Sequence, residues 1–197
     1  CLNHADRIQG ILITVIGSMA QLIITIFFGL IAILLLPNLM PSYDLFLTEL
    51  EFSYPIILFV AILLSTLLIM LFLNTSIFTV LLSKFKFLNR FSKYSNVFSF
   101  YNSSELLEVL LYSAVRYMIF TAQFFILLNL FSVEVSYINS MILTSTMLFV
   151  ISIIPTIAIT EIGIRGSVAL YLFTLVSNNS IGILSATLCL WIINLVI

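Results

Sequence analysis

Apolar residues dominate this chain in six long segments, which short polar connections separate. The segments cover residues 8–36, 55–82, 106–130, 136–154, 161–176 and 181–197. The first two carry no charged side chain at all. An uncharged apolar stretch of about 18 or more residues is long enough to cross the hydrocarbon core of a bilayer. The pattern predicts an all-α, polytopic transmembrane helical bundle with about 5–6 membrane segments.

One of these segments differs from an ordinary span. Pro155 removes a backbone donor where the fourth segment ends, and Gly163 and Gly166 either loosen the backbone or let another helix approach closely. The apolar stretch 167–176 that follows is short, and stretches of that length are typical of broken or re-entrant elements. We therefore expect a helix break at Pro155, Gly163 and Gly166, and leave open whether 155–176 crosses the membrane or re-enters.

The charged loops predict the orientation. Basic residues concentrate in loop 84–104, whereas loop 37–54 has acidic residues and no Lys or Arg. The positive-inside rule places 84–104 in the cytoplasm and 37–54 outside. Aromatic residues alternate with the basic ones in 84–104, as in segments that lie on an anionic inner leaflet.

Composition narrows the function classes. Hydrophobic residues make up 62% of the chain and charged residues 8%, where a globular domain has about a quarter charged. The only basic cluster is the short loop between two apolar segments, so nothing in the sequence suggests nucleic-acid binding. With one His and two Cys, no metal or cofactor motif is present. We expect no cofactor, and expect residues 1–197 to be a single transmembrane domain cut from a longer protein, because no Met begins the chain.

Polar side chains share one face of the predicted helix 106–130. At about 100° per residue, this face carries Glu105, Val109, Tyr112, Arg116, Phe120 and Gln123. Such a face should contact protein or a water-filled cavity rather than lipid. Two interpretations stay open: Arg116 locks helices together by pairing or snorkelling, or it binds an anion, because a guanidinium forks well onto phosphate.

A second polar group follows the break at Pro155. Thr160 is expected to be a helix N-cap, with Glu161 in the first turn behind it. If the helix N-terminus and Arg165 open into a cavity, they would bind phosphate. In the alternative, Glu161 and Arg165 pair with each other across one turn of an ordinary hairpin. Two arginines on neighbouring elements favour the phosphate cavity.

The first segment carries small and polar residues along one face. At this spacing, small residues let helices approach closely, and an amide can form a hydrogen bond across the interface. We predict a helix-packing face, made of Gly17, Ser18, Gln21, Thr25 and Gly29.

Three stretches together resemble the lysylphosphatidylglycerol synthase transmembrane (flippase-like) family of bacterial membrane proteins. They are Gly17-Ser-Met-Ala-Gln21 with Thr25 and Gly29; Ser113-x-x-Arg116-Tyr117-x-x-Phe120-x-x-Gln123; and Pro155-Thr156 with Glu161-Ile-Gly163-Ile-Arg165-Gly166. The chain departs from the family at Gly166, where many members have Glu. The resemblance implies a multi-pass protein of the bacterial cytoplasmic (inner) membrane, linked in some members to the movement of a phospholipid between leaflets.

Three functions follow from these observations. In the first, the chain is not an enzyme and translocates a phospholipid or a lipid-linked anionic substrate, with Arg116, Arg165, Thr160, Gln123, Tyr112 and Glu161 as the binding residues. In the second, it is an accessory or scaffold subunit for a lipid-modifying enzyme, namely a lipid- or polyprenol-linked glycosyltransferase. In the third, which lacks a paired catalytic group, Glu161 or Glu105 acts in a membrane enzyme. The sequence leaves the lipid, the direction of movement and the oligomeric state open.

Overall fold

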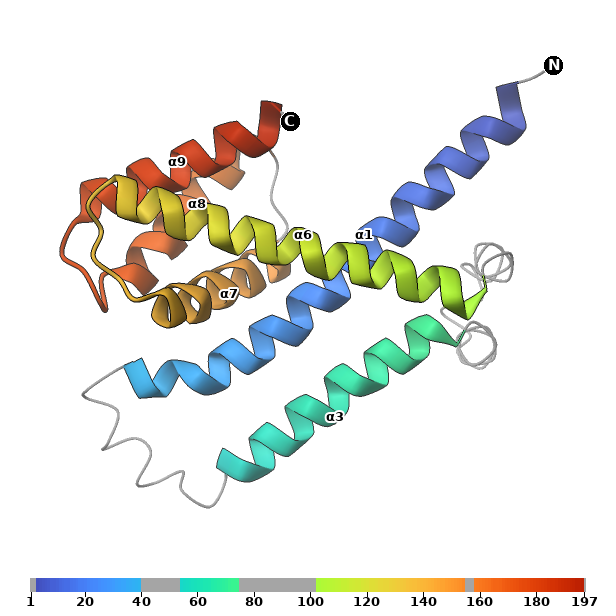
Figure 1. Cartoon of the computed structure of the whole chain (residues 1–197), viewed down its shortest axis with the longest axis horizontal. Helices are drawn as coiled ribbons and strands as arrows, with labels where there is room; N and C mark the ends of the chain where they lie inside the picture. Colours follow the sequence, from blue (N-terminus) through green and yellow to red (C-terminus); the bar gives the residue numbers. More distant parts are fainter. Residues whose placement is uncertain (1–2, 40–53, 75–101, 155–157, 197) are drawn as a thin grey trace. The chain divides into compact units, whose positions relative to one another are not determined.

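The computed structural model describes residues 3–39, 54–74, 102–154 and 158–196, which form six α-helices, one short 3-10 helix and no strand (Figure 1). The predicted all-α class is therefore confirmed for this part of the chain. The elements, in chain order, are α1 (Asn3–Leu35), η1 (Leu36–Leu39), α3 (Tyr54–Leu73), α6 (Ser103–Leu130), α7 (Tyr137–Ile153), α8 (Ala158–Phe173) and α9 (Ser180–Val196).

Each of the six apolar segments of the sequence coincides with one helix. The predicted and observed ends differ most for the second segment, which was expected to reach residue 82. Helix α3 ends at Leu73, and residues 75–82 lie outside the described part. Most of the predicted loops 37–54 and 84–104 lies outside it as well. Among the described helices, Ile13–Leu35 and Ser103–Leu130 are long and apolar enough to cross a membrane. Shorter apolar helices cover Ile62–Leu73, Tyr137–Ile153 and Ser180–Asn194.

The chain divides into two compact units. The first comprises Cys1–Ile24 and Leu63–Arg116, and the second comprises Thr25–Ile62 and Tyr117–Ile197. The single domain expected from the sequence stays a prediction. The second unit contains the candidate site.

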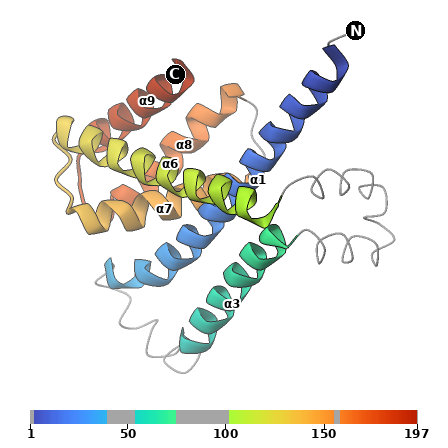
Figure 2. The same cartoon turned by 45° about the vertical axis from the view of Figure 1, so that its right-hand side comes forward.

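The core of the second unit is built by α6, α7, α8 and α9. Its buried members are Phe124, Leu128, Val133, Leu143, Met147, Ile151, Ala169, Leu172, Phe173, Ile183, Ala186 and Leu190. The rings of Phe124 and Phe173 meet edge to face, with 5.4 Å between their centroids. Helices α8 and α9 lie side by side, as in Figure 2, and the short connection between them makes an antiparallel hairpin.

The C-terminal end of α1 packs closely on α7. A Cβ atom at Gly29 would overlap the side chain of Phe149, so only a glycine fits this approach. Thr25 is buried on the same helix, and the ring of Phe28 stacks on Tyr117 with 4.9 Å between centroids. The structure therefore places Thr25 and Gly29 of the predicted packing face at a helix contact.

The N-terminal members of that predicted face are placed differently. A Cβ atom at Gly17 would meet nothing within 4 Å. Ser18 is exposed and donates a hydrogen bond to the carbonyl of Thr14, 2.8 Å away on its own helix. Gln21 is half-buried. Among the described residues, the close helix approach is thus found at the end of the stripe.

Asn179 anchors the α8–α9 hairpin to the connection between α6 and α7. Its Nδ2 donates to the carbonyl oxygens of Phe131 at 3.0 Å and Ser132 at 3.1 Å. Its Oδ1 accepts from the backbone N–H of Gly182 at 2.9 Å, which makes Asn179 the N-cap of α9. Ser132 has a φ of 57°, the left-handed conformation that allows this tight turn. One side chain thus fixes where α9 begins relative to α6.

Candidate functional site

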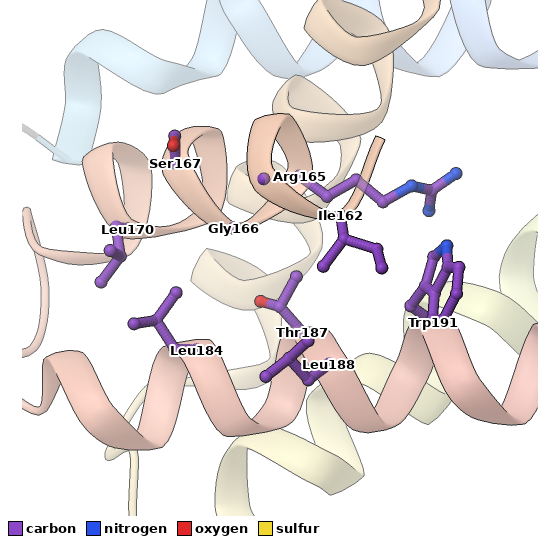
Figure 3. Close-up of a pocket in the computed structure, with 10 residues that line it drawn as sticks. Ile162, Arg165, Gly166, Ser167, Leu170, Leu184, Thr187, Leu188 and Trp191 are labelled. Atoms are coloured by element: carbon purple, nitrogen blue, oxygen red, sulfur yellow. The ribbon is translucent and has the colours of Figure 1, made fainter. Parts of the chain in front are cut away.

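A pocket of about 240 Å³ lies between α8 and α9 (Figure 3). Leu170 on α8 and Leu184 on α9 lie at one end of it, and Ile162 and Leu188 continue the apolar wall. At the other end, the side chain of Arg165 extends toward Trp191, so that the guanidinium and the indole lie near each other. The pocket is therefore apolar along its length and polar at one end.

Two glycines shape the side of the pocket that α8 contributes. A Cβ atom at Gly166 would lie 3.2 Å from Cδ2 of Leu184, so the absence of a side chain there lets α9 approach. A Cβ atom at Gly163 would meet nothing within 4 Å. Because neither glycine carries a side chain, space remains between the two helices.

The prediction that Gly163 and Gly166 break a helix is wrong, because α8 runs through both from Ala158 to Phe173. The backbone hydrogen bonds of a helix do not need a side chain, and glycine weakens a helix without ending it. The break lies earlier, between the end of α7 at Ile153 and the start of α8. Ile154 is extended there, as residues before a proline usually are. Pro155 itself lies outside the described residues.

Arg165 forms an ion pair with Glu161, one helical turn earlier. The guanidinium donates from Nε at 2.8 Å and from Nη2 at 2.5 Å, both to Oε1 of the carboxylate. Of the two alternatives that the sequence left open here, the structure contains the pairing within one helix. The side chains keep 21% and 28% of their surface exposed, so the pair stabilises the helix by no more than about 1 kcal/mol.

The first turn of α8 differs from the expectation at Thr160. Because α8 begins at Ala158, Thr160 lies inside the first turn and is not the N-cap, so that prediction is wrong. Thr160 is exposed. Glu161 also lies in this turn, where the partial positive charge of the helix N-terminus favours a carboxylate.

The polar stripe of α6 is largely exposed in the structure. Tyr112 keeps 72% of its surface exposed, and Arg116 is exposed as well. Phe120 and Gln123 are half-buried. Glu105 at the helix start accepts a hydrogen bond from the backbone N–H of Asn102 at 3.0 Å, which is a capping role.

The two predicted arginines belong to different units. Arg116 is the last residue of the first unit, and Arg165 lies in the second. A shared phosphate cavity between them therefore stays a prediction. Within the second unit, the residues brought together are Arg165, Glu161 and the pocket lining.

The part of the pocket that α9 contributes was not predicted from the sequence. Leu184, Thr187 and Leu188 line the pocket, but nothing distinguishes them from other residues of an apolar helix. Trp191 also lines the pocket, and on the same helix the side chain of Asn194 donates to the carbonyl of Leu190 at 2.8 Å. The N-cap Asn179 had a signal, since an Asn before an apolar run is typical of a helix start.

Metal binding finds no support in the described residues, which contain no group of three or more His, Cys, Asp or Glu side chains able to hold an ion. Comparisons of the chain with protein-family models, curated proteins and solved structures found no match. The resemblance to the flippase-like family therefore stays a prediction.

Proposed function

We propose that this chain is an integral, multi-pass protein of the bacterial cytoplasmic membrane that binds a phospholipid and moves it between leaflets. Support comes first from the two helices long enough to span a membrane. Helix α3 adds to this, because it is apolar throughout apart from Tyr54, Ser65 and Thr66. Phe59 and Met70 on this helix keep 66% and 69% of their surface exposed. Exposure of such apolar side chains to lipid costs no free energy, whereas their exposure to water is unfavourable.

In this proposal the α8–α9 hairpin is a broken or re-entrant membrane element. Helix α8 has 16 residues, and about 1.5 Å per residue makes it roughly 24 Å long. The hydrocarbon core is about 30 Å thick. A hairpin of this length keeps the polar end of the pocket within or near the membrane. The positive-inside rule gives the orientation, with loop 84–104 in the cytoplasm and loop 37–54 outside.

One observation carries the lipid-binding role: the pocket is apolar along its length and has Arg165 at one end, where Glu161 pairs with the guanidinium from one turn earlier on α8. A phospholipid has the same division, with a charged headgroup and apolar tails. The headgroup would lie at Arg165 while an acyl chain contacts Ile162, Leu184 and Leu188. Trp191 beside the guanidinium suits the level where headgroups meet tails. This role requires binding and passage only, without a bond-breaking step.

The test measures lipid movement by the full chain reconstituted into vesicles, with a headgroup-labelled fluorescent phospholipid and a membrane-impermeant quencher. Leu188→Trp fills the pocket, while Ile192→Trp adds the same side chain to the same helix outside the pocket. The wild-type residues are similarly exposed, at 44% and 51%, which makes them a matched pair. We expect translocation to be lost in Leu188→Trp and retained in Ile192→Trp. Equal rates in both variants would overturn the proposal.

A second candidate function rests on the exposed stripe of α6. Tyr112 and Arg116 present a phenol and a guanidinium on a helix long enough to span a membrane, and polar groups there suit contact with another membrane protein. An accessory subunit of a lipid- or polyprenol-linked glycosyltransferase would use this stripe. Such an enzyme should copurify with the wild type and be lost with Arg116→Leu. Retention of the enzyme by that variant would discard this alternative.

A further inference from the structure

Arg165 lines the end of the pocket, and its ion pair with Glu161 uses only part of the hydrogen-bonding capacity of the two side chains. Both contacts from the guanidinium end on the same carboxylate oxygen, Oε1 of Glu161. Within the part of the chain that the structure describes, Oε2 of Glu161 and Nη1 of Arg165 form no hydrogen bond. A carboxylate oxygen accepts hydrogen bonds and a guanidinium nitrogen donates them. One acceptor and one donor of opposite charge are thus left together.

The net charge of this end of the pocket decides which headgroup it suits. Glu161 neutralises Arg165, so a purely anionic headgroup that reaches the guanidinium also meets a carboxylate. The headgroup and the carboxylate repel each other, and this repulsion offsets part of the attraction between the headgroup and the guanidinium. A purely cationic group meets the converse problem at Arg165. A headgroup that carries both charges avoids both.

We infer that the pocket selects a zwitterionic glycerophospholipid with an ammonium group over an anionic one. The phosphate accepts from Nη1 of Arg165, and the ammonium donates to Oε2 of Glu161. This inference rests on the proposed function, since it names the headgroup for the lipid pocket. It also differs from the anionic ligand that two unpaired arginines predicted from the sequence.

The pocket contains its own reporter. Trp191 is the only tryptophan of the sequence and lines the pocket at the end where Arg165 lies (Figure 3). A lipid with bromine atoms on its acyl chain quenches tryptophan fluorescence only at contact. Quenching of Trp191 therefore measures occupancy of this pocket, and the headgroup can be varied while the chains stay the same.

The experiment titrates the purified full chain in detergent micelles with dibrominated phosphatidylethanolamine or dibrominated phosphatidylglycerol. We expect phosphatidylethanolamine to reach half of its maximal quenching at a mole fraction about threefold lower than phosphatidylglycerol, a modest preference because the pair is partly exposed. Trp191→Phe combined with Ile192→Trp moves the reporter outside the pocket. In that variant the two lipids should quench equally.

Glu161→Gln tests the charge argument directly. The amide keeps the size of the side chain and removes the negative charge, so phosphatidylglycerol should become the preferred lipid. Glu134→Gln is the matched control, because Glu134 is exposed and does not line the pocket, and it should behave as the wild type.

The outcomes separate this inference from the proposed function. Quenching by neither lipid would overturn both. Saturable quenching of the wild type that favours phosphatidylglycerol, or shows no preference, would overturn the inference and leave lipid binding in place. An unchanged preference in Glu161→Gln, or the same preference with the relocated tryptophan, would also overturn it.

Discussion

Asn179 holds the α8–α9 hairpin in place by its side-chain hydrogen bonds, so its replacement should destabilise the second unit. Asn179→Ala removes the N-cap of α9, which costs about 0.5–2 kcal/mol. It also removes the two hydrogen bonds donated to the carbonyls of Phe131 and Ser132, each worth about 0.5–1.5 kcal/mol. Together these give a loss of about 1.5–5 kcal/mol in the free energy of unfolding.

The neighbouring Asn178 provides the matched control. Its residue is exposed, and its side chain forms no hydrogen bond among the described residues, so Asn178→Ala should change the free energy of unfolding by less than about 0.5 kcal/mol. Asn179→Asp separates the two contributions, because it keeps the acceptor for Gly182 and loses both donors. We expect it to be destabilised, since a carboxylate then faces two carbonyl oxygens.

The assay is reversible unfolding of the detergent-solubilised chain by a rising fraction of sodium dodecyl sulfate, followed by circular dichroism. Asn179→Ala should unfold at a clearly lower fraction than Asn178→Ala. If the two alanine variants unfolded together, Asn179 would not be the anchor of the hairpin. If Asn179→Asp matched the wild type, the cap alone would account for its role.

The remaining predictions use the same unfolding assay. Gly182→Ala should destabilise by about 1–3 kcal/mol, because its Cβ atom would lie 2.6 Å from the carbonyl oxygen of Phe131. Gly163→Ala, which has open space, should instead stabilise α8 by about 0.5–1 kcal/mol, and the same sign for both would contradict the packing. Tyr117→Phe should change stability by less than about 1 kcal/mol, because the buried Tyr117 hydroxyl lies near Ser145 without a hydrogen bond of good geometry in the described residues. Tyr117→Ala should cost about 3–5 kcal/mol, since the ring is 1% exposed and stacks on Phe28.

The helices were predictable because their signal is local and strong. An apolar stretch as long as 106–130 leaves few alternatives to a helix, and the structure has α6 at Ser103–Leu130. The wrong predictions concern where a helix begins or ends: a helix break was assigned to two glycines and an N-cap to Thr160. Gly166 was expected either to break a helix or to let another helix approach, and it lies within α8 and admits Leu184, which is the second alternative. A glycine can serve a break or a close approach, and its neighbours in sequence do not distinguish the two.

The pocket was not predictable from the sequence, because it depends on how two helices align. Leu184 and Leu188 face α8 only because α9 begins where Asn179 caps it and contacts the carbonyl of Phe131. That contact joins residues far apart in the chain, so no local pattern records it. The Glu161–Arg165 pair is the opposite case. Its spacing of one turn was visible in the sequence as one of two alternatives, because both partners lie on one helix.

The two arginines differ in what their own helices supply, and this difference separates the functional alternatives. Arg165 has a carboxylate one turn away, which would lower the cost of placing its charge at membrane depth in the proposed membrane protein. Arg116 has none, since the residues one turn before and after it are Tyr112, Ser113, Ile119 and Phe120. A lone guanidinium in a membrane costs about 2.5–3.5 kcal/mol on insertion scales, so under the proposed function its counter-charge would come from outside α6. A lipid phosphate in that place makes Arg116 part of a translocation path, whereas a carboxylate of another membrane protein makes it a docking residue.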